Sequence, residues 1–251
     1  IIEDLLKRDA IKINVKKNKS QYEQKIILIT GAAGSIGSEI VRQLINYIPK
    51  KLILVDNSEL SLFNIKNELS ELNINIKVDY LLKSVTDNHS IDKVFKNNKI
   101  DIVFHAAAFK NVFMTESSPS DSILNNIMGT KNVLDNAIKY DVTNFVLVST
   151  DKAVNPSNVM GASKRIAEIY ASILSDKSKT KIITTRFGNV LGSSGSVVPI
   201  FKKQILNGGP VTITDPDITR YFMTITEACQ LVLEAGAIGK GGEIYVFDMG
   251  D

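Results

Sequence analysis

The chain has 251 residues, 44% hydrophobic content and a formal net charge of +3. That much apolar sequence can bury the core of one large α/β domain, and the charge is too small to indicate nucleic-acid binding. A single cysteine, Cys229, excludes an internal disulfide. The two histidines, His89 and His105, have no partners at metal-ligand spacing, so no metal site is predicted. No stretch is apolar for long enough to span a bilayer, and no signal peptide is visible.

Apolar runs and helical patterns alternate along the chain after Lys25. The apolar runs lie at 26–30, 52–55, 74–78, 101–104, 144–148 and 181–185, and the helical patterns lie near 35–47, 58–72, 89–97, 120–139 and 158–175. This alternation predicts an α/β fold with a Rossmann-type doubly wound parallel sheet, whose ligands bind at the carboxyl ends of the strands.

We expect three parts: an N-terminal arm over 1–24, a Rossmann domain over 25–187 and a smaller C-terminal substrate-binding lobe over 188–251. The chain opens within a helical pattern and stops just after a strand pattern. We therefore expect the lobe to be truncated and the parent protein to be longer.

A glycine-rich segment follows the first apolar run. Gly31, Gly34 and Gly37 lie between a strand pattern and a helix pattern, where glycine allows a sharp turn and the first amide groups of the helix face a pyrophosphate. The second strand ends at Asp56, where a carboxylate would meet the adenosine ribose hydroxyls. No arginine follows Asp56 to accept a ribose 2′-phosphate, so NAD is favoured over NADP.

Small and polar residues also follow the fourth, fifth and sixth strands, as Ala106–Ala108, Ser149–Lys152 and Arg186–Asn189. Because the carboxyl ends of parallel strands meet at one edge of the sheet, we expect these residues to form one site. Met160 and Lys164 lie four residues apart at the start of a predicted helix, so both project from one face. A lysine there can bond the nicotinamide ribose, and position 160 is where a nicotinamide enzyme would carry a proton-transferring tyrosine.

These motifs resemble those of the extended short-chain dehydrogenase/reductase superfamily. More closely, the chain resembles the bacterial UDP-N-acetylglucosamine 4,6-dehydratases of surface-polysaccharide and protein-glycan synthesis, from about Ile2 to its end. The segments that carry this likeness are 149–156, 160–165, 186–197 and 217–224. In that family, methionine in place of tyrosine, as at Met160, marks the membrane-anchored members that retain the configuration at C-5.

The resemblance implies NAD as cofactor, UDP-N-acetylglucosamine as substrate and a homodimer or higher homo-oligomer. It also implies a parent protein held at the cytoplasmic face of the bacterial inner membrane by a missing N-terminal region. Two segments depart from the family pattern. Asn111–Phe113 follows Lys110 where His-Val-Pro is usual, and Lys83–Val85 replaces Gly-Asp-Val, which weakens any expectation of a carboxylate at the adenine.

In the expected reaction a hydride leaves C-4 of the sugar, a proton leaves C-5, the 6-hydroxyl departs as water and the stored hydride returns at C-6. We assign Asp151 as the acid for the leaving hydroxyl and Lys152 as the C-5 base, a pair that the family also implies. A thioether such as that of Met160 cannot accept the C-4 hydroxyl proton. Thr150 could polarise that hydroxyl while Asp151 or an ordered water takes the proton, and the sequence leaves these alternatives open.

The predicted site residues fall into three groups. The catalytic group is Thr150, Asp151, Lys152, Met160 and Lys164. The cofactor group is Gly31, Gly34, Ser35, Ile36, Gly37, Asp56, Val85, Ala106, Ala107, Ala108, Asn126, Ser149 and Lys164. The substrate group is Lys110, Asn189, Ser194, Ser196 and Arg220, with Arg220 for the phosphate charge.

Three alternative functions remain. A nucleotide-sugar 4-epimerase shares the fold and the cofactor but needs no acid for O-6, so the adjacent Asp151 and Lys152 disfavour it. A C-5-inverting dehydratase would carry tyrosine at position 160. A catalytically silent NAD-binding module would fit the loss of that tyrosine, but not the intact acid–base pair.

Overall fold

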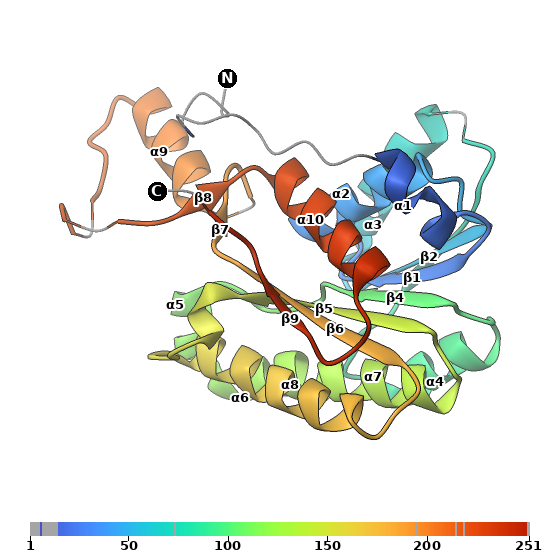
Figure 1. Cartoon of the computed structure of the whole chain (residues 1–251). Coiled ribbons are helices and arrows are strands. Elements are labelled where there is room, and N and C mark those ends of the chain that lie inside the picture. The colour runs from blue at the N-terminus through green and yellow to red at the C-terminus, as the bar shows by residue number, and fades with distance from the viewer. Residues whose placement is uncertain are drawn as a thin grey trace.

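The computed structural model describes residues 6, 15–72, 74–193, 195–213, 215–217 and 219–249. In this part of the chain, a parallel sheet has the strand order β3-β2-β1-β4-β5-β6-β9 (Figure 1). Its strands are β1 (Ile26–Thr30), β2 (Lys51–Asp56), β3 (Lys77–Leu82), β4 (Ile102–His105), β5 (Asn144–Thr150), β6 (Lys181–Phe187) and β9 (Ile244–Val246). The central strands are nearly continuous apolar runs because both of their faces are buried. The predicted Rossmann-type fold class is confirmed.

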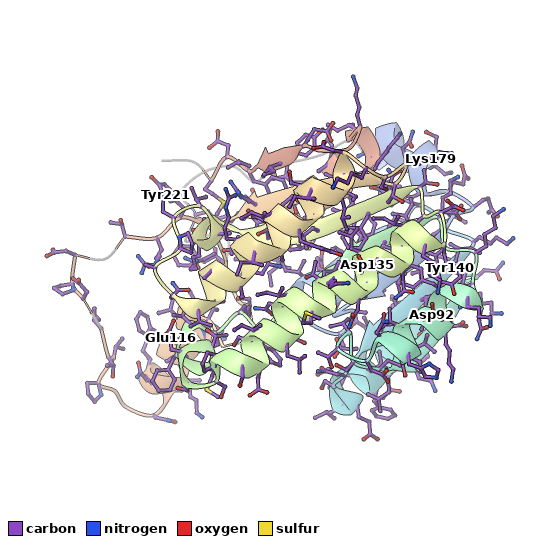
Figure 2. The ribbon with its side chains drawn as sticks, turned by 90° about the horizontal axis from the view of Figure 1, so that it is seen from below. Asp92, Glu116, Asp135, Tyr140, Lys179 and Tyr221 are labelled. Carbon is purple, nitrogen blue, oxygen red and sulfur yellow. The ribbon has the colours of Figure 1, made fainter. Side chains whose placement is uncertain are left out.

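Helices cover both faces of the sheet (Figure 1). One layer contains α1 (Val15–Tyr22), α2 (Ser35–Ile45), α3 (Glu59–Glu71) and α10 (Ile225–Ile238). The other, seen from below in Figure 2, contains α4 (Asn88–Lys96), α7 (Gly129–Lys139) and α8 (Val159–Ser175). Each layer has its own apolar core. Leu44 and Val232 belong to the first core, and Phe95 and Val133 belong to the second. The apolar stripe of each helix is therefore removed from water against the sheet, which stabilises the layered fold.

Two elements differ from the sequence prediction. β3 covers Lys77–Leu82 rather than 74–78, because its position is set by residue-by-residue pairing with β2 and not by the alternating apolar residues before it. The helical pattern over 120–139 divides into α6 (Pro119–Ile123), a π-helical turn η2 (Leu124–Met128) and α7, after the short helix α5 (Val112–Ser117). Turns of this kind are frequent at functional sites, and η2 buries two asparagines, Asn125 and Asn126.

The C-terminal segment 188–251 is not one separate lobe. β7 (Asn189–Val190) and β8 (Phe222–Met223) pair with each other outside the main sheet, and α9 (Val197–Leu206) extends from them (Figure 1). The chain then returns to the main body, where α10 packs on α2 and β9 pairs with β6. It returns because α10 has an apolar face, including Cys229 and Val232, that is buried in the core. Below, "the lobe" means the described residues of 189–223.

Part of the predicted N-terminal arm also packs on the main body. Residues 1–5 and 7–14 lie outside the described residues. Tyr22, at the end of α1, is buried, and its hydroxyl donates a hydrogen bond to the Leu233 carbonyl in α10. Burial raises the pKa of Tyr22 well above its ordinary value.

Candidate active site

The glycine loop lies where the strand order of the sheet reverses. β1 pairs with β2 on one side and with β4 on the other, and open α/β sheets bind ligands in the crevice above such a point. Gly31 has a φ of +63°, and a Cβ there would lie 2.7 Å from the Ala107 backbone. A Cβ on Gly37 would lie 2.0 Å from the Gly31 carbonyl oxygen. Glycine is therefore required at both positions.

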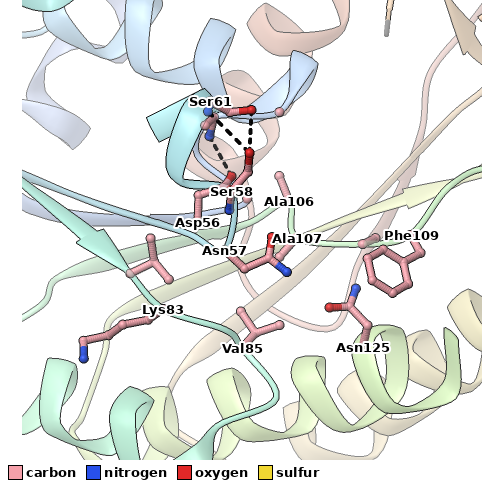
Figure 3. Close-up of a pocket in the computed structure, with 15 residues that line it drawn as sticks. Asp56, Asn57, Ser58, Ser61, Lys83, Val85, Ala106, Ala107, Phe109 and Asn125 are labelled. Carbon is pink, nitrogen blue, oxygen red and sulfur yellow. Dashed lines mark hydrogen bonds between the residues drawn. The ribbon is translucent and has the colours of Figure 1, made fainter. Parts of the chain in front are cut away.

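A pocket of about 240 Å³ opens at this loop (Figure 3). Its lining comes from the segments that follow four strands and from η2: Gly31, Ala33, Gly34, Val55, Asp56, Asn57, Ser58, Ser61, Lys83, Val85, Ala106, Ala107, Ala108, Phe109 and Asn125. Asp56 is held in place because its two carboxylate oxygens accept the backbone N–H groups of Ala33 and Ser58, each at 2.9 Å. Gly34 lines the pocket and caps α2, so the amide groups that begin this helix face it, as an anion site requires.

Buried side chains hold the adjoining Ala106–Ala108 loop from behind. His105 is fully buried, with its Nδ1 2.6 Å from the Thr30 hydroxyl and its Nε2 3.0 Å from the Thr130 hydroxyl. Thr130 donates its proton to the Asn126 carbonyl, so Nε2 of His105 carries the ring proton and Nδ1 accepts from Thr30. Burial, together with nearby Lys164, lowers the pKa of His105 to about 3. This histidine is a neutral core residue.

Asn126 clamps the same loop. Its Oδ1 accepts the Phe109 N–H at 2.7 Å, and its Nδ2 donates to the Phe109 carbonyl and to the Ser163 hydroxyl, each at 3.0 Å. Because the buried amide is saturated by protein partners, Asn126 fixes the loop against α8. The direct cofactor contact stays a prediction.

The proposed acid and base lie at the end of β5, where a 3₁₀ turn η3 (Asp151–Ala153) begins. Thr150 donates a hydrogen bond to Asp151 Oδ1 at 2.8 Å, and Lys152 Nζ lies 3.0 Å from the same oxygen. Lys152 also donates to Asn189 Oδ1 in β7 at 3.2 Å. The Asp151 side chain is 47% exposed and that of Lys152 is 28% exposed, so a substrate can reach both. Asn189, predicted as a substrate residue, thus contacts the base directly.

The amino end of α8 packs on this turn. A Cβ on Gly161 would lie 2.4 Å from the Lys152 carbonyl oxygen, and Asn158 caps the helix by accepting the Gly161 N–H at 2.8 Å. Met160 and Lys164 are both buried on the helix. Lys164 Nζ donates to the Val148 carbonyl at 2.7 Å. Burial lowers the pKa of Lys164 to about 8, although the neighbouring Glu168 acts in the opposite direction.

The side chain of Ser149 also points toward α8. Its hydroxyl donates to Glu168 Oε1 at 2.5 Å within the protein, and Ser149 does not line the pocket. Arg186, opposite Ser149 in β6, donates to the same carboxylate at 2.9 and 2.6 Å. Ser149 therefore belongs to a buried ionic cluster, and its predicted cofactor contact has no support from this geometry.

The other predicted substrate residues lie in or near the lobe. Ser194 lies outside the described residues. Ser196 begins α9, and its buried hydroxyl has no hydrogen-bond partner among the described residues. Arg220 is exposed, and its guanidinium donates to the Thr219 carbonyl at 2.8 Å. Lys110 follows the Ala106–Ala108 loop, and partial desolvation lowers its pKa although the side chain still reaches solvent.

Sequence reasoning missed several residues that the structure brings to the site. In the pocket these are Ala33, Val55, Asn57, Ser58, Ser61, Lys83, Phe109 and Asn125. Asn57 and Ser58 could have been predicted, because they are polar residues that directly follow the end of the second strand. Glu168, one turn after Lys164 on α8, was also missed.

A glycine loop at the switch point of a parallel sheet, together with a buried lysine on the helix after β5, is typical of the extended short-chain dehydrogenases/reductases. The model of the family described as "Polysaccharide biosynthesis protein" matches residues 27–251. The chain belongs to this family.

Individual proteins agree with this assignment. "Capsular polysaccharide biosynthesis protein CapD" of Staphylococcus aureus is 51% identical over 251 residues, covering 99% of this chain and 42% of that protein. "UDP-glucose 4-epimerase" of Rickettsia rickettsii is 37% identical over 230 residues, covering 90% of this chain and 66% of that protein.

Solved structures share the fold. Pen from Bacillus thuringiensis has a TM-score of 0.86 at 35% identity, with 91% of this chain and 69% of that chain covered. DesIV, a dTDP-glucose 4,6-dehydratase from Streptomyces venezuelae with NAD and DAU bound, has a TM-score of 0.80 at 22% identity, with 90% of this chain and 76% of that chain covered. The second likeness concerns the fold alone.

The chain spans less than half the length of CapD. Within the described ranges, no helix is long and apolar enough to cross a membrane. The same ranges bring together no group of three or more His, Cys, Asp or Glu side chains that could hold a metal ion.

Proposed function

We propose that this chain is the catalytic part of an NAD-dependent 4,6-dehydratase that acts on UDP-N-acetylglucosamine, retains the configuration at C-5 and serves bacterial surface-glycan synthesis. The observation that carries the proposal is the Thr150–Asp151–Lys152 cluster, because dehydration needs an acid at O-6 and a base at C-5. Membership of the polysaccharide-biosynthesis family supports the pathway. As the resemblance implies, we place the parent protein at the cytoplasmic face of the inner membrane.

The pocket fits the adenosine and pyrophosphate portions of NAD. Asp56 is held at the position of the ribose hydroxyls, and the start of α2 after Gly34 suits the pyrophosphate. Lys164 is the donor for the nicotinamide ribose. NAD⁺ held by these residues would supply the acceptor for the hydride of C-4 and, once reduced, the hydride donor for C-6.

The side chains of the cluster move the protons. The Thr150 hydroxyl donates to Asp151, so it can accept the C-4 hydroxyl proton and pass its own proton to that carboxylate. Asp151 then gives this proton to O-6 as the C6–O6 bond breaks and water leaves. The Met160 thioether takes no part in proton transfer.

Lys152 removes the C-5 proton, exchanges it with solvent through its N–H groups, and later delivers a solvent-derived proton to C-5. Because a single amine does both from one face of the sugar, C-5 keeps its configuration. Asn189 fixes the amine by accepting one of its hydrogen bonds at 3.2 Å. The orphan hydroxyl of Ser196 and the exposed Arg220 are the donors that we propose for the substrate diphosphate.

NMR of the purified protein with UDP-N-acetylglucosamine in D₂O tests the proposal. We expect a 6-deoxy-4-keto product with the gluco configuration at C-5 and deuterium there, with no product from Lys152→Met. An inverted C-5 would overturn the retaining mechanism. UDP-N-acetylgalactosamine as product would establish the 4-epimerase, the function that the Rickettsia relative's name favours. Bound NAD without any turnover would indicate a silent binding module.

We also propose a homodimer that forms through α8. Ile166, Ile169 and Ile173 make a stripe on this helix at helical spacing, and each is nearly half exposed. The substitution Ile169→Glu should shift the sedimentation of the protein from dimer to monomer, whereas Ile200→Glu on α9 should leave it unchanged. A monomeric wild-type protein would exclude this interface.

A further inference from the structure

Glu168 is a buried charge that the proposed reaction does not use. Its side chain is 1% exposed and lies one helical turn after Lys164 on α8. The carboxylate accepts hydrogen bonds from Ser149 at 2.5 Å and from two nitrogens of Arg186 at 2.9 and 2.6 Å. Arg165 adds a fourth contact at 3.2 Å from a more exposed position. The Arg186 contact is bidentate, the geometry with the greatest directional specificity for a carboxylate.

The partners of Glu168 come from the strands that carry the reacting groups. Ser149 in β5 is directly followed by Thr150–Lys152, and Arg186 in β6 leads within three residues to Asn189. Ser149 and Arg186 are opposite each other in the β5–β6 ladder. One carboxylate on α8 therefore fixes the ends of both strands just before the chain enters the active site.

The pKa of Glu168 reflects the strength of its hydrogen bonds with Arg186 and Ser149. Burial alone would raise the pKa of Glu168, but the hydrogen bonds from Arg186 and Ser149 outweigh burial and hold the pKa below its ordinary value. A buried ion pair is often no more stabilising than apolar side chains of the same volume. Stability alone is thus a weak reason for this cluster, whereas its fixed geometry has a direct use at the site.

We propose that Glu168 is a positioning residue for the dehydration. Through Ser149 and Arg186, it holds the Asp151–Lys152 pair and Asn189 in register with Lys164 on its own helix. This inference rests on the proposed function. Glu168 does not touch the substrate, so its loss should affect the chemical step more than substrate binding.

Steady-state kinetics of Glu168→Gln test this role in the full chain. We expect kcat to fall by roughly tenfold to a hundredfold while KM stays within about threefold, because a small misplacement of reacting groups slows chemistry far more than binding. The control Arg165→Ala removes the outer contact to the same carboxylate and should keep kcat within about twofold. If Glu168→Gln leaves Arg186 as an unpaired buried charge and does not fold, Glu168→Gln/Arg186→Gln removes that charge and should show the same loss of kcat. A folded double variant with wild-type kcat would overturn the proposal.

A second readout does not need turnover. Methionine labelled with ¹³C at the methyl group reports on Met160, on α8, and on Met249, whose methyl would lie 3.2 Å from a Cβ on Gly188, near Asp151. In Glu168→Gln we expect both signals to shift while those of the exposed Met114 and Met128 stay in place. If both signals shift in Glu168→Gln but the wild-type protein shows no dehydratase activity, the proposed function is refuted and the positioning role still stands. Unshifted signals would refute the positioning role.

Discussion

The proposed cofactor side and the proposed reacting side of this site are built in different ways. Around the glycine loop, the geometry comes from backbone packing: Gly31 and Gly37 leave no room for a side chain, and Asp56 is fixed by two peptide N–H groups. At the ends of β5 and β6, it comes from side chains that reach between separate segments, as Lys152 reaches Asn189 and Ser149 reaches Glu168. The first region is therefore fixed by backbone packing, and the second is fixed by contacts of individual side chains.

Because of this difference, we expect mutations in the two regions to change different properties of the protein. A change at Gly31 or Gly37 should act on folding and NAD binding together, since the tightly packed backbone there serves both. A change on the reacting side should act on chemistry and leave the fold in place. Three substitutions test this separation, in order of decreasing expected effect.

Gly37→Ala should be the most damaging. The added Cβ would lie 2.0 Å from the Gly31 carbonyl oxygen and 2.8 Å from the Ala32 Cα, both backbone atoms that cannot move without disrupting the β1–α2 turn. We expect loss of the folded state in thermal unfolding. Gly34→Ala is the matched control within the loop: its Cβ would have only an ordinary contact of 3.4 Å, so the variant should fold while binding NAD more weakly. If Gly37→Ala and Gly34→Ala had the same melting temperature, the close backbone packing at Gly37 would not be what stabilises this turn.

Asp151→Asn should lower kcat by roughly 10²–10⁴-fold, the usual cost of losing a general acid, with little change in stability because the side chain is 47% exposed. The melting temperature and NAD affinity should match those of the wild type. Asp121→Asn, at an exposed position on α6, provides the control for a lost surface carboxylate. Retention of most of the activity in Asp151→Asn would remove this residue from the mechanism.

Lys164→Met should have a smaller effect on stability, and the effect should depend on pH. Burial lowers the pKa of Lys164 to about 8 from 10.5, so between these values the unfolded chain binds more protons than the folded one and wild-type stability rises with pH. Below pH 8 the wild type carries a penalty on the order of 3 kcal/mol, partly offset by about 1 kcal/mol from the hydrogen bond to Val148. Urea unfolding should therefore show the variant to be more stable at pH 7, with the difference shrinking by pH 10.5.

The matched control for that experiment is Lys139→Met. The hydrogen bond to Asp92 raises the pKa of this exposed lysine, so its substitution should not stabilise the protein at pH 7. A pH-independent difference between the wild type and Lys164→Met would mean that Lys164 is not desolvated in the folded protein.

The contrast between the two regions also explains what could be read from the sequence. The glycine spacing and the strand alternation are local patterns, so they predicted the fold and the place of Gly31 and Asp56. Ser149 was expected at the cofactor, and that contact stays a prediction; what the sequence did not reveal is that its hydroxyl donates to Glu168. Glu168 takes its contacts from α8, β5 and β6, and no spacing along the chain reveals that.

The pairing of β7 with β8 has a consequence for how such proteins can diversify. Asn189 and Phe222 are partners, so the chain leaves and re-enters the main body at almost the same place. The short β7–β8 pair therefore holds together the two ends of the intervening segment. Under the proposed function, segments of other lengths and sequences could take its place without altering the sheet, so sugar specificity would change while the cofactor-binding sheet stays the same.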